Sequence, residues 1–78
     1  MQYDYKALGR VIRRLRKERG VTQDVLSGFA VLTRSHLAMI ERGQKKATLD
    51  TLLKIVTAFE MRLSDLFRLV EEEINNQN

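Results

Sequence analysis

The 78-residue chain contains no cysteine and no proline, and it has one histidine. The lack of cysteine excludes disulfide bonds and thiolate chemistry, and one histidine leaves too few ligands for a zinc site of the usual type. No apolar run approaches the ~20 residues that a membrane span needs, and the N-terminus lacks the apolar core of a signal peptide. We therefore expect a cytoplasmic protein with no membrane contact, no metal and no other cofactor.

The composition is rich in leucine, arginine, glutamate and lysine, which are residues that favour helices. A chain of this length allows one domain, residues 1–78, which buries about 60% of its unfolded surface or slightly more. Composition and length therefore predict a single all-α domain.

The net charge of +4 is unevenly distributed along the chain. Residues 1–46 carry a formal charge of +7, whereas residues 47–78 carry −3. A basic half suits a polyanion, because each neutralised phosphate releases counterions. Six of the ten residues from Arg10 to Arg19 are basic. The alternative is that this run is only a solvated helix face.

Hydrophobic periodicity predicts five helices, at about 4–19, 23–30, 34–42, 49–59 and 65–75. We expect Gly20 to end the first helix, and Thr22, Thr33, Thr48 and Ser64 to cap the next four. The inner faces expected for the second to fourth helices are Val25, Leu26, Phe29, Ala30, Leu37, Ile40, Leu49, Leu52, Leu53, Val56 and Phe59. Short helices joined by short loops predict one compact bundle.

The second and third helical patterns, within residues 22–43, are joined by a turn too short to let them lie parallel. The third opens with the polar residues Thr33, Arg34, Ser35 and His36. This segment is a candidate helix-turn-helix, the unit that places a short helix in the DNA major groove.

The segment resembles the Cro and phage-repressor type of helix-turn-helix, also called the xenobiotic-response-element family. The resemblance rests on Thr22-Gln23, Leu26, Leu32-Thr33 and Ile40-Glu41-Arg42-Gly43, and on the stretches TLDTLLKIVTAF and LSDLF. It covers about residues 6–70 and implies a compact five-helix, lambda-repressor-like DNA-binding domain.

The resemblance also implies roles for individual residues. It places base-reading side chains at Arg34, Ser35, His36 and Met39. It places phosphate contacts at the start of the second helix, at Thr22 and Gln23. We also expect phosphate contacts at Thr33, which caps the third helix, and at Lys45 and Lys46, which follow that helix. An ion pair between Arg16 and Glu41 links the first helix to the third. The chemistry agrees, since an arginine bound to guanine discriminates by about 1–3 kcal/mol.

Each base-reading assignment has a simpler alternative. Arg34 could be solvated, Ser35 could only extend the helix cap, His36 could be an ordinary surface histidine, and Met39 could fill the core. Ser35 and His36 do not form a catalytic pair, because neighbours in a helix do not face each other. With no acid pair, thiol, metal cluster or phosphate loop, we do not expect an enzyme.

The sequence departs from the family at the turn and at one helix contact. Val31 stands where the family has a small residue, often glycine, in a turn that commonly needs a positive φ. Ser27 replaces a usual alanine, and its hydroxyl can bond to a carbonyl one turn earlier. Either the turn adopts another shape at Val31 or it tolerates the strain. Both changes bear on the docking angle of the third helix rather than on the DNA-contacting groups.

The resemblance implies a sequence-specific transcription regulator that binds a palindromic operator as a homodimer, with no small-molecule ligand. Half-sites are expected about 34 Å apart. The expected dimer surface is the last helix, with Leu66, Phe67, Leu69, Val70 and Ile74; the alternative is that these residues form core. The favoured subtype is a controller protein of a restriction–modification system. The competing reading is an antitoxin-like module whose main partner is a toxin protein.

Overall fold

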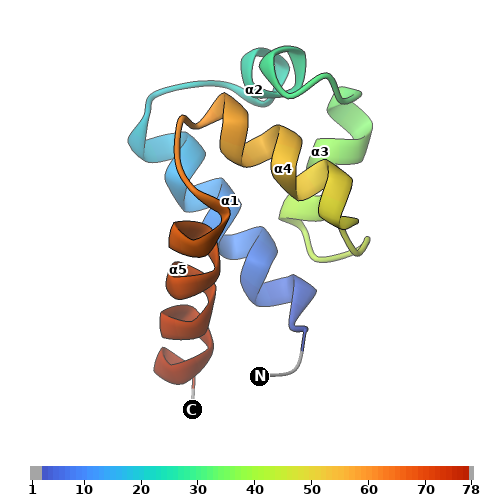
Figure 1. The fold of residues 1–78 in the computed structure, drawn as a ribbon. Helices are drawn as coiled ribbons and strands as arrows, with labels where there is room; N and C mark the ends of the chain where they lie inside the picture. The colour runs from blue at the N-terminus through green and yellow to red at the C-terminus, as the bar shows by residue number, and fades with distance from the viewer. Residues whose placement is uncertain (1–2, 78) are drawn as a thin grey trace.

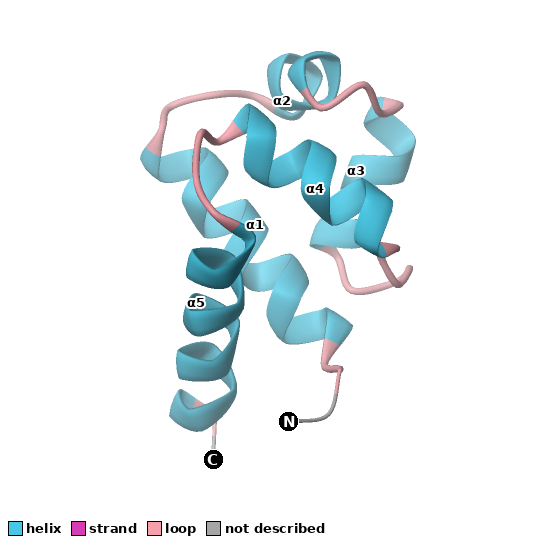
Figure 2. Cartoon of the chain, in the orientation of Figure 1, coloured by secondary structure: helices cyan, strands magenta, loops and turns pink. Residues whose placement is uncertain are grey.

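A computed structural model describes residues 3–77 and shows five helices around one core (Figure 1). The helices are α1 (Tyr5–Glu18), α2 (Gln23–Phe29), α3 (Arg34–Glu41), α4 (Leu49–Ala58) and α5 (Leu63–Asn76). Figure 2 shows only helices and loops in this part of the chain. The predicted five-helix, all-α fold is confirmed. Within residues 3–77, none of the helices combines the length and apolar character that a bilayer crossing requires.

Helix α1 packs against both α3 and α5, α2 packs against α3 and α4, and α4 also packs against α5. The buried apolar side chains come from all five helices and the loop before α4. They are Ala7, Leu8, Val11, Ile12, Leu15, Leu26, Ala30, Leu37, Ile40, Ala47, Leu52, Ile55, Val56, Phe59, Leu66 and Val70. Burying one large aliphatic side chain contributes about 1.5–3 kcal/mol. This core therefore fixes α3 relative to α1.

Four helices begin with a side chain that accepts a hydrogen bond from a free backbone N–H. Thr22, Thr33 and Thr48 cap α2, α3 and α4 as predicted, and Asp4 caps α1. The prediction that Ser64 caps the last helix is wrong. Helix α5 begins at Leu63, because the Asp65 carboxylate accepts a hydrogen bond from the Arg62 N–H at 3.2 Å.

The turns after the first four helices share one geometry, in which a residue with positive φ follows the helix. These residues are Gly20, Val31, Gly43 and Glu60, with φ values of 67°, 55°, 70° and 55°. In each turn the next residue's N–H bonds to a carbonyl five residues earlier, as in a Schellman motif. Val31 therefore adopts the positive φ expected for a small residue, with its side chain in solvent.

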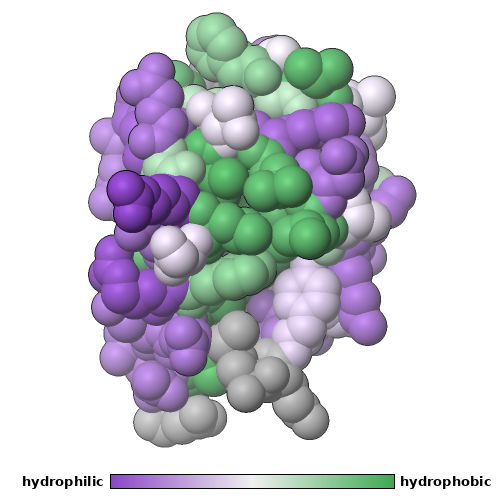
Figure 3. Space-filling model, in the orientation of Figure 1, coloured by the Kyte–Doolittle hydropathy of each residue, from purple (hydrophilic) through white to green (hydrophobic). Residues whose placement is uncertain are grey.

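Four residues expected in the core are exposed instead. Val25 and Phe29 are 43% and 71% exposed, and Leu49 and Leu53 are 58% and 46% exposed. The short helix α2 buries Leu26, Ser27 and Ala30, so at about 100° per residue its Val25 and Phe29 lie outside the buried face. Leu49 and Leu53 belong to α4, and apolar side chains gather at the centre of the face that carries this helix (Figure 3).

Candidate nucleic-acid interface

The outer face of α3 lines a shallow groove together with the start of α2. The lining residues are Gln23, Arg34, Ser35, Ala38, Met39 and Arg42. Residues 34, 38 and 42 form one row along α3, and residues 35 and 39 form the adjacent row. The opposite face of α3 is buried through Leu37, Ile40 and Glu41. The groove is therefore the solvent-facing side of a helix that is anchored from behind.

Three of the four predicted base-reading residues, Arg34, Ser35 and Met39, line this groove. His36 does not line it, because it lies about 100° beyond Ser35, in the row of buried Ile40. Arg42 also lines the groove, although no DNA contact is predicted for it from the sequence. Its spacing of eight residues from Arg34, two steps along one helical row, could have revealed it.

The two arginines of the groove have exposed polar contacts. The Nε atom of Arg34 lies 3.6 Å from the Asp24 carboxylate, and these side chains are 65% and 70% exposed. Arg42 Nε donates to Gln44 Oε1 at 3.1 Å. Surface contacts of this kind contribute at most about 1 kcal/mol, so either guanidinium can turn toward a ligand.

The predicted phosphate contacts at the helix starts lie beside the groove. The hydroxyl oxygens of Thr22 and Thr33 accept hydrogen bonds from the N–H groups of Val25 and His36. Each hydroxyl keeps its own hydrogen for a further acceptor. Gln23 lines the groove, but its Nε2 donates to Glu41 Oε1 at 3.1 Å. In this state Gln23 therefore braces α3.

Arg16 and Glu41 form a buried pair that joins α1 to α3. Arg16 Nε and Nη2 donate to the two Glu41 oxygens at 2.7 and 3.0 Å, and Nη1 donates to the Val21 carbonyl at 2.9 Å. The hydrogen bond to Glu41 raises the pKa of Arg16. With Gln23 on the same carboxylate, this network connects α1, the α1–α2 loop, α2 and α3, and so fixes the groove.

The close approach of α1 and α3 depends on Gly9. A Cβ atom at this position would meet the carbonyl oxygen of Ile40 and lie 2.7 Å from that of Glu41. Sequence reasoning missed this role, because glycine inside a helix gives no local sign of what packs against it. Gly9 therefore helps to set the position of the groove.

The other predicted site residues lie away from the groove lining. Lys45 and Lys46 are exposed in the loop between α3 and α4, and Lys46 Nζ lies 5.5 Å from the Tyr5 ring centroid. Of the predicted dimer residues, Leu66 and Val70 are buried in the chain's own core and offer no surface to a partner. Phe67, Leu69 and Ile74 are only partly buried.

The chain is similar in sequence to known helix-turn-helix proteins. Residues 12–66 match the helix-turn-helix family HTH_3. The chain is 32% identical over 71 residues to the competence pilus inhibition repressor of Acinetobacter baylyi, covering 91% of this chain. It spans only 64% of the length of that repressor.

Two solved structures of restriction–modification controller proteins share the fold. C.AhdI of Aeromonas hydrophila is 33% identical with a TM-score of 0.80, over 85% of this chain and 100% of C.AhdI. C.Esp1396I, solved as a tetramer in complex with its natural 35-base-pair operator, is 27% identical with a TM-score of 0.85, over 95% and 97% of the two chains.

Proposed function

Since the chain belongs to the helix-turn-helix family of DNA-binding transcription regulators, we propose that it binds a palindromic operator as a homodimer with α3 in the major groove. The observation that carries this proposal is the α3 groove. Arg34, Ser35, Met39 and Arg42 face solvent on one side of a helix whose other side is held by the Arg16–Glu41 pair. A rigidly held helix can present these groups to base edges in a fixed register.

A dimer is proposed because one short helix reads only a few base pairs, too few to single out an operator among genomic sites. The exposed Leu49 and Leu53 of α4 provide an apolar surface. A hollow beside Leu49 is lined by Tyr3, Ala47, Leu52 and Phe67. This α4–α5 surface, defined by Leu49, Leu53 and Phe67, is the proposed contact with a second copy.

Selection of binding sites from a pool of random duplex DNA tests the proposal. We expect enrichment of two inverted half-sites with centres about 34 Å apart, one helical turn. Arg34→Ala should relax preference at one base position, whereas Lys46→Ala should weaken binding to all sequences alike. A pool without any enriched motif at moderate salt would contradict specific operator binding and favour the antitoxin-like alternative.

Within the family, we propose the restriction–modification controller subtype, supported by the similarity to C.AhdI over its whole length. Genes for a restriction enzyme and its methyltransferase beside the gene for this chain would support the subtype. Neighbouring genes of unrelated function would count against it.

A further inference from the structure

Two of the basic residues of α1 are bound to α5. Arg10 Nε lies 2.7 Å from Glu73 Oε2, and Arg14 Nη1 lies 3.1 Å from Glu73 Oε1. The hydrogen bond from Arg10 is the main reason that the pKa of Glu73 is lowered. The positive charge of this side of α1 is therefore partly neutralised within the chain.

Two further cations, Arg16 of α1 and the residue Arg19 that caps its C-terminus, also have partners in the chain. Arg16 holds Glu41, and Arg19 Nη2 donates to the Phe59 carbonyl at 3.3 Å, with its guanidinium carbon 4.6 Å from the Phe59 ring centroid. Among the basic residues from Arg10 to Arg19, this leaves Arg13 and Lys17. Both are exposed, and neither forms an ion pair with any residue from 3 to 77.

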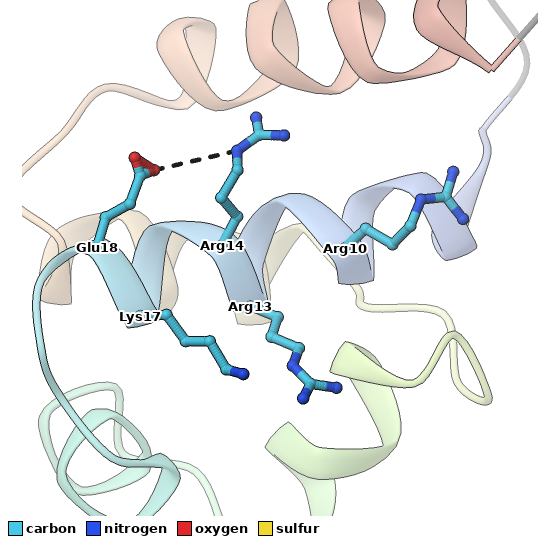
Figure 4. A pocket seen from close by; sticks show the side chains of 5 residues that line it. All are labelled: Arg10, Arg13, Arg14, Lys17 and Glu18. Atoms are coloured by element: carbon cyan, nitrogen blue, oxygen red, sulfur yellow. Dashed lines mark ion pairs between the residues drawn. The ribbon is translucent and has the colours of Figure 1, made fainter.

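Arg13 and Lys17 lie on the side of α1 that faces α2 and α3. Gly9, Arg13 and Lys17 are spaced by four residues and so follow one row along the helix. Gly9 touches the backbone at the end of α3, and Lys17 precedes the loop that leads to Thr22. Figure 4 shows both cations extending toward the side of α2 and α3, whereas Arg14 and Glu18 extend toward α5.

Like charges four residues apart repel each other in a helix. The Arg10–Arg14 pair is compensated by Glu73, but no described acidic group compensates the Arg13–Lys17 pair. On the basis of the proposed function, we propose that Arg13 and Lys17 form a phosphate-binding ridge, which contacts the backbone of one operator strand beside the groove. The ridge would contribute affinity without reading sequence.

The test compares two double variants that remove the same charge from the same helix. Arg13→Ala/Lys17→Ala removes the ridge, and Arg10→Ala/Arg14→Ala is the matched control. Binding of each to the selected operator is followed by fluorescence anisotropy between 50 and 200 mM salt. Circular dichroism at the working temperature checks that each variant is folded.

Each lost phosphate contact should reduce the slope of log affinity against log salt by about 0.9. The slope of the ridge variant should therefore be about 1.8 smaller than that of the wild type. The ratio of wild-type affinity to variant affinity should then fall about twelvefold between 50 and 200 mM salt. The control should keep the wild-type slope. Preference for the operator over a single-base variant should be unchanged when the ridge is removed.

Equal slopes for the ridge variant and the wild type would overturn the ridge and leave operator binding intact; the row would then face solvent or another partner. Equal losses in both double variants would also overturn it, because the effect would be one of general charge. If the wild type binds no duplex at all, the proposed function fails together with the ridge.

Discussion

Val31 is a β-branched residue whose backbone is in the left-handed region, with a φ of 55°. Its side chain is 76% exposed, so little packing offsets the strain. For an L-residue this conformation costs roughly 1–2 kcal/mol, and glycine avoids most of that cost. We expect Val31→Gly to raise the free energy of unfolding by about 0.5–1 kcal/mol, measured by urea denaturation.

Val25→Gly is the matched control for this substitution. Val25 is also an exposed valine, but it lies within α2, where glycine is the poorer residue. This variant should lose a few tenths of a kcal/mol. If both glycine variants change stability in the same direction, the backbone at residue 31 is not the cause.

At the scale of the elements, the α1–α3 crossing depends on Gly9, since any side chain there would meet the α3 backbone. Backbone cannot move aside as a flexible side chain can, so Gly9→Ala should lower the free energy of unfolding by about 1–3 kcal/mol. Gly28→Ala is the control, because a Cβ there meets nothing within 4 Å. It should be neutral or stabilising by up to about 1 kcal/mol in the same denaturation experiment.

The Arg16–Glu41 pair joins α1 to α3, and the two side chains are 11% and 2% exposed. Glu41→Gln leaves the Arg16 charge without its partner in a largely dry site. We expect the free energy of unfolding to fall by about 3 kcal/mol. This value is at the lower end of the cost of breaking a buried ion pair, because Arg16 keeps some contact with water.

The double variant Arg16→Met/Glu41→Gln removes the stranded charge as well. It should therefore lose clearly less stability than the sum of the two single variants. Additive losses in a double-mutant cycle would mean that the two side chains do not depend on each other.

The helices and their caps could be predicted because their signals are local, as at Thr22 and Thr48, where a threonine precedes an apolar pattern. The start of α5 was misplaced because Asp65, which bonds back to Arg62, competes with Ser64 as the capping group. The exposure of Phe29 could not be predicted, since it depends on which side of α2 meets α3 and α4. For the same reason, the family motif indicated Arg34 and Ser35, but only the fold shows that His36 lies outside the groove lining.

At the scale of the whole molecule, Glu73 attaches α5 to α1, and its pKa is lowered mainly by the hydrogen bond from Arg10. A lowered pKa in the folded state stabilises the protein above the ordinary glutamate value of 4.5. This contribution is lost as the pH falls through the folded-state pKa.

Glu73→Gln should therefore unfold more easily than wild type at pH 7, by at most about 1 kcal/mol, because both arginines are exposed. The difference should shrink steadily in urea denaturation series below pH 4.5. A difference that stays constant down to acid pH would show that the Glu73 charge does not stabilise the fold.

The proposed dimer depends on the α4–α5 surface, where Leu53 is 46% exposed although leucine favours burial. Leu53→Asp places a charge at this surface without disturbing the buried face of α4. We expect sedimentation equilibrium to show a shift to monomer with an unchanged circular dichroism spectrum, because a buried unpaired charge opposes association.

Operator binding should weaken in parallel, since two half-sites are read together only by a dimer. Phe29→Asp is the control, because Phe29 is an apolar residue of α2 with 71% exposure that lies outside the α4–α5 surface. It should associate as the wild type does. If Phe29→Asp dissociates the dimer and Leu53→Asp does not, the contact between copies lies on α2. If the wild type sediments as a monomer at micromolar concentration, the α4–α5 surface does not bind a second copy.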